Sequence, residues 1–303
     1  MRQPEFFSGG VSPQKAEQVI RSFKQLAEQG AAAVPAIREY LDRFQDIDFE
    51  AVGAGKLIGY PSLRIGLLDA LGQIGGPEAT DLSLQILENT GDPQEIAFLA
   101  KGLEKQLPPE QLRPIALAAA SDALAQALGG ESDGRNLAPL FEVLQKFGDQ
   151  NVVGLLEQAA GKWNFYATLA LAGLPDGAGV PALVKLAQDA ATSGVGNVES
   201  ALRPLAQAAT QFPAARAALV EQARLNQVPD SAWPGIAASL EGNYILYGKQ
   251  IFGSTAPPVV WSPEQINLRL ELIDQMLAVT TSPAAVGALQ NARAQVLSKP
   301  PKK

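Results

Sequence analysis

The chain has 303 residues, of which 47% are hydrophobic and only 18% are charged, so it has ample apolar surface for a core and wholesale disorder is excluded. Histidine and cysteine are both missing, which excludes histidine acid–base catalysis, disulfides, thiolate nucleophiles and sulfur-ligated zinc. The formal net charge of -7 opposes broad attraction to nucleic acid or anionic lipid.

The first predicted elements are two helices over residues 12–30 and 34–44. Ser12 and Pro13 are typical of a helix N-terminus, with a capping hydroxyl followed by proline at the first helical position. Residues 45–61 break the helical pattern and are predicted to form a long irregular connection.

The clearest pair of helices is predicted within residues 62–91. Apolar residues at helical spacing follow Ser62 and again follow Pro77. Gly75 and Gly76 lie between them, where glycine ends one helix and proline opens the next. Each helix has one apolar stripe, so the pair needs another pair beside it to bury that stripe.

The remaining chain predicts further helices that are separated by short turns. Two sets of residues, Asp92 to Glu95 and Ser262 to Gln265, have the pattern of a capping box. The predicted helices cover approximately residues 93–107, 110–128, 137–147, 152–160, 164–174, 180–191, 198–212, 214–226, 232–240, 263–279 and 283–298. Almost no sheet is expected.

Three motifs resemble HEAT-type repeats. The first predicted helix of the 62–91 pair ends in Leu71-Gly72-Gln73-Ile74-Gly75, and other helices open with Val34-Pro35-Ala36-Ile37 and Val180-Pro181-Ala182-Leu183. The resemblance implies an all-α fold, a superhelical HEAT-like solenoid of antiparallel helix pairs in one domain over residues 1–303, with irregular connections near 45–61 and 242–261. A two-domain helical bundle is the structural alternative.

Two segments share some features with ligand-binding sites. Residues 52–57 resemble a phosphate loop, but the glycine spacing is wrong and no Ser or Thr follows Lys56. An acidic run, Asp42, Asp46, Asp48 and Glu50, lacks the ligand spacing of a calcium loop. A flexible connection and a solvated loop are the favoured interpretations, so neither catalytic residues nor a metal or cofactor is expected.

Aromatic residues gather in the irregular segment 242–261. Tyr244, Tyr247, Phe252 and Trp261 hold a large share of the chain's scarce aromatic side chains. Tyrosine and tryptophan are common anchors in interfaces, so these four are the predicted partner-binding residues. The favoured alternative is a hydrophobic lid that covers one end of the repeat array. Both roles are compatible.

The function predicted from these features is a non-catalytic scaffold for a protein or peptide partner, without nucleic acid, cofactor or membrane span. One alternative is an enzyme with a HEAT-like fold, similar to bilin lyases or DNA alkylpurine glycosylases. Another is a structural spacer or oligomerisation domain. A soluble protein is expected, with a cytoplasmic location favoured and a processed exported protein left open.

Overall fold

The computed structural model describes residues 11–43, 45–130, 134–193, 198–245, 247, 251–252 and 261–299. Within these residues the regular secondary structure is helical, and Asp48 and Ser62 form an isolated β-bridge without any strand. The all-α class predicted from the sequence is therefore confirmed. The chain forms two compact units, Met1–Ala123 and Leu124–Lys303; the prediction of a single domain stays a prediction.

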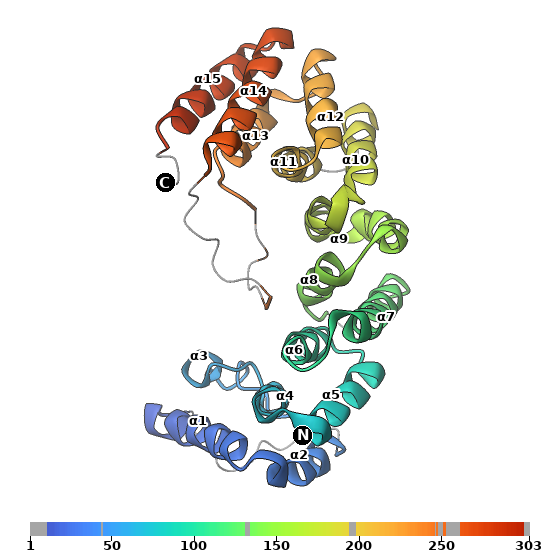
Figure 1. Ribbon diagram of the computed structural model, residues 1–303, viewed down its shortest axis with the longest axis vertical. Coiled ribbons are helices and arrows are strands. Elements are labelled where there is room, and N and C mark those ends of the chain that lie inside the picture. Colours follow the sequence, from blue (N-terminus) through green and yellow to red (C-terminus); the bar gives the residue numbers. More distant parts are fainter. Residues whose placement is uncertain are drawn as a thin grey trace. The chain divides into compact units, whose positions relative to one another are not determined.

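The first unit consists of helices that contact their second and third neighbours along the chain. Helix α1 contacts α4, α4 contacts α6, and α2 contacts α5 (Figure 1). Consecutive helices α4, α5 and α6 also pack against one another, so each buries its apolar stripe on several partners. The helices are α1 (Pro13–Glu28), α2 (Val34–Leu41), α3 (Gly55–Ile58), α4 (Leu63–Ile74), α5 (Gly76–Asn89), α6 (Pro93–Leu103) and α7 (Pro109–Leu128), which crosses the division.

The turn between α4 and α5 forms as the sequence predicts. Gly75 and Gly76 have φ values of 62° and 77°, a region that favours glycine, and Pro77 follows in the first turn of α5. Ser62 caps α4 by accepting a hydrogen bond from the Ile65 amide at 3.3 Å. Local sequence thus fixes both ends of α4.

Two predictions for this unit need correction. The connection at 45–61 contains the short helix α3. Asp92 caps α6 as predicted, accepting from the Gln94 and Glu95 amides, but the Glu95 side chain does not complete a capping box. Its carboxylate instead accepts from Arg64 of α4 and from Thr90, because a charged partner offers a stronger hydrogen bond than a backbone amide.

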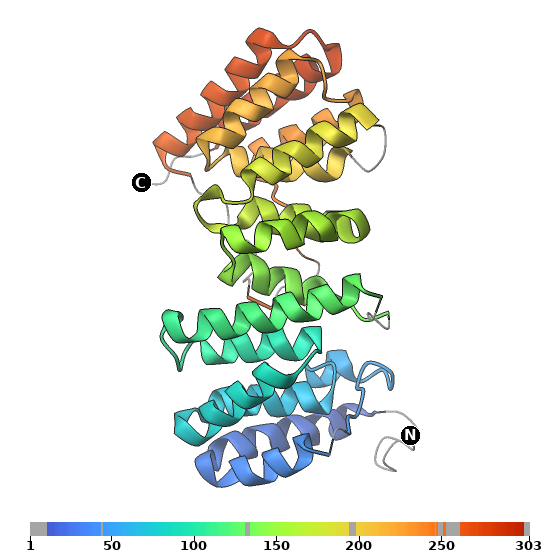
Figure 2. The ribbon, with the colours of Figure 1, turned by 90° about the vertical axis from the view of Figure 1, so that its right-hand side faces the viewer.

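The second unit repeats the arrangement of alternate helices. One row runs through α9, α11, α13 and α15, and another through α10, α12 and α14; neighbouring helices lie nearly antiparallel in Figure 2. The helices are α8 (Ala138–Phe147), α9 (Val153–Gly173), α10 (Val180–Ser193), α11 (Val198–Ala209), α12 (Pro213–Arg224), α13 (Trp233–Leu240), α14 (Pro263–Val279) and α15 (Pro283–Leu297).

Helix α9 joins two predicted helices across a kink. Trp163 has φ -126° and ψ 54°, which no α-helical residue adopts. The kink falls between the predicted helices 152–160 and 164–174, so the prediction of two elements is confirmed in its essentials. The part after the kink begins with aromatic residues that face α8: Trp163 and Tyr166 both contact the Phe141 ring.

The predicted capping box at α14 is present in full. Ser262 accepts from the Gln265 amide at 3.3 Å, and the Gln265 side chain accepts from the Ser262 amide at 3.0 Å. This fixes the point at which the chain re-enters a helix after the irregular segment 242–261.

Candidate functional site

The irregular segment between α13 and α14 contacts helices that precede it by up to 110 residues. We call its described residues Asn243, Tyr244, Ile245, Tyr247, Ile251 and Phe252 the strap. The residues that receive it are Glu142 and Gln145 of α8, Tyr166 of α9, and Arg203 and Gln207 of α11, and together they are called the docking face. Both belong to the second unit.

Arg269 of α14 holds both ends of the irregular segment. Its side chain is 2% exposed, and it donates to the Leu240 carbonyl at 3.1 Å and to the Tyr244 hydroxyl at 2.7 Å. The guanidinium lies 4.1 Å from the ring centre of the buried Trp261. Burial lowers the pKa of Arg269 below its ordinary value, while Tyr244 acts in the opposite direction.

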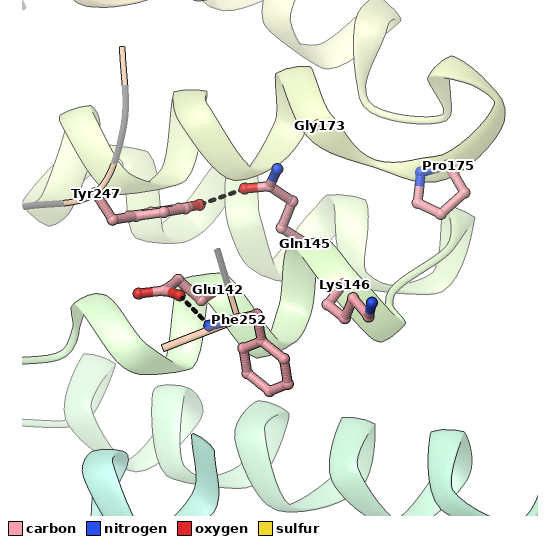
Figure 3. A pocket seen from close by; sticks show the side chains of 7 residues that line it. All are labelled: Glu142, Gln145, Lys146, Gly173, Pro175, Tyr247 and Phe252. Atoms are coloured by element: carbon pink, nitrogen blue, oxygen red, sulfur yellow. Dashed lines mark hydrogen bonds between the residues drawn. The ribbon is translucent and has the colours of Figure 1, made fainter. Parts of the chain in front are cut away.

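Tyr247 occupies a slot on the docking face. Its ring stacks on Tyr166 at a centroid distance of 6.2 Å, and Tyr166 stacks in turn on Phe141. The hydroxyl donates to Gln145 Oε1 at 2.9 Å (Figure 3). Burial raises the pKa of Tyr247 well above its ordinary value, and the negative charge of Glu142 adds to this effect. Tyr247 is therefore a neutral hydrogen-bond donor at neutral pH.

Gly173 of α9 makes this slot possible. A Cβ atom at position 173 would lie 2.1 Å from Gln145 Nε2, so glycine allows the Gln145 side chain to lie against the helix. In Figure 3 Gln145 reaches across toward Tyr247 from α8. Gly173 thus helps to position Gln145, the acceptor of the Tyr247 hydroxyl, because it has no side chain.

Glu142 binds the distal part of the strap through the main chain. The carboxylate is buried, and its Oε2 accepts from the Ile251 amide at 2.8 Å and the Phe252 amide at 3.2 Å. The Phe252 ring meets Phe147 edge to face at 5.8 Å. A carboxylate that accepts two amides makes a stronger contact than a neutral acceptor would.

Helix α11 binds the other described part of the strap. Gln207 Oε1 accepts from the Ile245 amide at 3.1 Å, and Arg203 Nη2 donates to the Asn243 carbonyl at 3.4 Å. Residues 203 and 207 are four apart, so they lie on one face of the helix. Side chains from α8 and α11 therefore contact main-chain groups along the strap.

A cavity of about 350 Å³ lies beside Tyr247 and Phe252 of the strap and Glu142 and Gln145 of the docking face. Figure 3 shows the side chains that line it. The exposed side chain of Lys146 is part of its lining, and Phe252 is half-buried. Its lining consists of Glu142, Gln145, Lys146, Gly173, Pro175, Tyr247 and Phe252. The strap thus leaves space on the docking face that another molecule could enter.

The four aromatic residues predicted from the sequence lie at two places. Tyr244 and Trp261 contact Arg269 at the base of the segment, and Tyr247 and Phe252 lie on α8 and α9. The sequence did not identify the docking face. One signal was available, because Glu142 is a charged residue in the otherwise apolar stretch of α8, where a buried carboxylate needs a partner.

The glycine-rich turn and the acidic run hydrogen-bond within their own connection and to the start of α4. The Phe49 carbonyl accepts from the Ala54 and Gly55 amides, so these amides of the glycine-rich turn point inward. Asp46 accepts from the Arg64 amide, and Asp48 accepts from the Ala51 amide. In the part of the chain that the structure describes, no group of three or more Asp and Glu residues is placed to hold a metal ion.

No family model, curated protein or solved structure matches the chain. Among the described helices, none has both the length and the apolar character required to cross a membrane.

Proposed function

We propose that this chain is a HEAT-like helical repeat scaffold that binds a protein or peptide partner without catalysing a reaction. The contacts between alternate helices in each unit support the repeat interpretation, since stacked helix pairs bury a continuous core in this way. The proline-containing openings of α2 and α10 add to it.

One observation carries the proposed binding role. Side chains of the docking face hydrogen-bond to amides and a carbonyl of the strap's main chain, through Glu142, Gln207 and Arg203. Every peptide has these groups, so a surface that pairs with them is suited to a non-helical segment of any origin. The slot for Tyr247 adds a side-chain preference to this general affinity.

The cavity beside the strap is the proposed point of entry for the partner. It exposes polar atoms of α8 next to aromatic rings, the mixture that is found in many peptide-binding sites.

The test is photocrosslinking from the cavity in lysate of the producing organism. A photoreactive amino acid replaces Lys146, and the matched control replaces Lys185, an exposed lysine of α10 outside the cavity lining. We expect a defined protein to crosslink from position 146, and this crosslink to disappear when Glu142 is also changed to Lys. Identical crosslinked products from both positions, or none from position 146, would overturn the proposal.

A further inference from the structure

We infer that the strap is a built-in competitor: it occupies the docking face in cis, and the partner is an extended peptide with an aromatic side chain that displaces it. This inference rests on the proposed function, because it names the partner's chemistry and the step that controls access to the same site.

The slot for Tyr247 defines the partner's side chain. It combines a flat aromatic wall, the Tyr166 ring, with an acceptor at its end, Gln145 Oε1. A tyrosine fits both features, whereas an aliphatic residue would fill the wall contact and leave the acceptor without its hydroxyl partner. The slot consists of residues from α8 and α9, so the strap is not needed to build it.

The main-chain contacts define the partner's conformation. Glu142 and Gln207 accept from amides of Ile251, Phe252 and Ile245, none of which lies in a helix. A helical peptide keeps only the amides of its first turn free, so it could not supply the amides of positions 245 and 251–252 together. A non-helical peptide therefore satisfies the docking face, while a helical one does not.

The strap can leave the docking face without unfolding its own base. Tyr244 and Trp261 are bound by Arg269, which is buried against α13 and α14, whereas Tyr247 and Phe252 contact α8 and α9. Leaving the docking face breaks the hydrogen bonds of the Tyr247 hydroxyl and three amide bonds to Glu142 and Gln207. It also breaks the bond from Arg203 to the Asn243 carbonyl and the ring contacts. The base contacts with Arg269 would remain as they are.

Tethering explains why the strap competes well against a free peptide. A short tethered segment has an effective concentration on the order of 1 mM at its own site. If the free peptide binds with a Kd of about 100 µM, the tethered strap weakens its apparent affinity by about tenfold. Release of the strap should therefore raise the apparent affinity of the free peptide by about tenfold.

The experiment measures binding of a fluorescent peptide with the sequence of residues 242–252, GNYILYGKQIF, to the full chain by anisotropy. The strap is released by Tyr247→Ala with Phe252→Ala, because deleting residues 242–261 would also remove the partners of Arg269. We expect the released variant to bind the peptide at least tenfold more tightly than the unchanged chain.

Two matched controls assign the binding to the slot. Gly173→Ala in the released variant pushes Gln145 away and should weaken binding severalfold, and a peptide with alanine in place of Tyr247 should lose affinity in the same way. Circular dichroism is the check that each variant keeps its helices. Should the double variant lose helicity, Tyr247→Phe with Phe252→Ala gives a milder release.

Equal binding to the released and unchanged chains, or no binding to a folded released variant, would overturn the inference. The two proposals fail separately. Peptide binding without a crosslinked partner at position 146 leaves the strap as a competitor and removes the proposed function. A crosslinked partner without peptide binding supports the proposed function and removes the role of the strap as a competitor.

Discussion

Arg64 shows how one residue ties several elements together. Its guanidinium donates to Glu95 of α6 at 2.6 Å and to the Leu41 carbonyl at the end of α2 at 2.8 Å. Burial acts to lower the pKa of Arg64, but the hydrogen bond and negative charge of Glu95, with the charges of Asp46 and Asp92, together outweigh it, so the pKa is raised. The pair is largely buried, with side chains only 15% and 9% exposed.

Glu95→Gln is predicted to destabilise the first unit. The change removes the hydrogen-bonded counter-charge of the buried Arg64, which costs about 3 kcal/mol, the low end of the range for such a loss. Urea unfolding followed by circular dichroism measures this free energy. Asp274→Asn breaks the exposed pair with Arg293 and serves as the control, for which little change is expected. Equal effects of the two substitutions would contradict the role of Arg64.

At the scale of elements, close packing of helices depends on glycines at particular positions. Gly66 of α4 faces the Phe23 ring of α1, and a Cβ at position 66 would lie 2.2 Å from Phe23 Cζ. Phe23 is buried and meets Tyr60 edge to face at 5.2 Å. The ring therefore has little freedom to move, and α1 approaches α4 only because position 66 has no side chain.

Gly66→Ala is predicted to lower stability by about 1–3 kcal/mol, because the added methyl group overpacks a filled contact. Gly287→Ala in α15 is the matched control: nothing lies within 4 Å of its Cβ position. Alanine there should raise stability by about 0.5–1 kcal/mol, since it reduces the backbone freedom of the unfolded chain. Thermal unfolding midpoints should move in opposite directions. A shift in the same direction would contradict the packing argument.

At the scale of the whole molecule, charge is the property that limits the choice of partner. The formal net charge is -7. Most of it lies in the unit Met1–Ala123, whereas acidic and basic residues nearly balance in Leu124–Lys303. A protein of this charge repels the phosphate backbone unless a local basic surface overcomes the repulsion. The peptide-binding role is consistent with this balance, because peptides need not carry negative charge.

The full chain is predicted not to bind duplex DNA, including duplexes with an alkylated base. Anisotropy of a labelled duplex at about 50 mM salt is the sensitive condition, because electrostatic binding is strongest at low salt. The measurement also separates the binding scaffold from the DNA glycosylase alternative. Saturable binding that weakens steeply as salt is added would favour the DNA glycosylase alternative over the binding scaffold.

The helices and their ends could be predicted from the sequence because short-range interactions decide them. The Gly75-Gly76-Pro77 turn and the Ser262–Gln265 capping box each involve residues within a few positions of one another. Helical spacing of apolar residues likewise depends only on the local backbone. These features formed as expected, and the all-α class followed from them.

The docking face depended on tertiary structure. Glu142 and Ile251 are 109 residues apart, and Gln207 and Ile245 are 38 apart, so no local pattern links them. The aromatic residues of the segment 242–261 could be recognised as unusual from the sequence. That Tyr244 and Trp261 would contact Arg269, while Tyr247 would stack on Tyr166, could not be predicted. Glu95 illustrates the same limit, since its carboxylate accepts from Arg64 of another helix and does not accept from the nearby Asp92 amide. Side chains choose among distant partners only after the helices have packed, because packing determines which charges and rings come within reach.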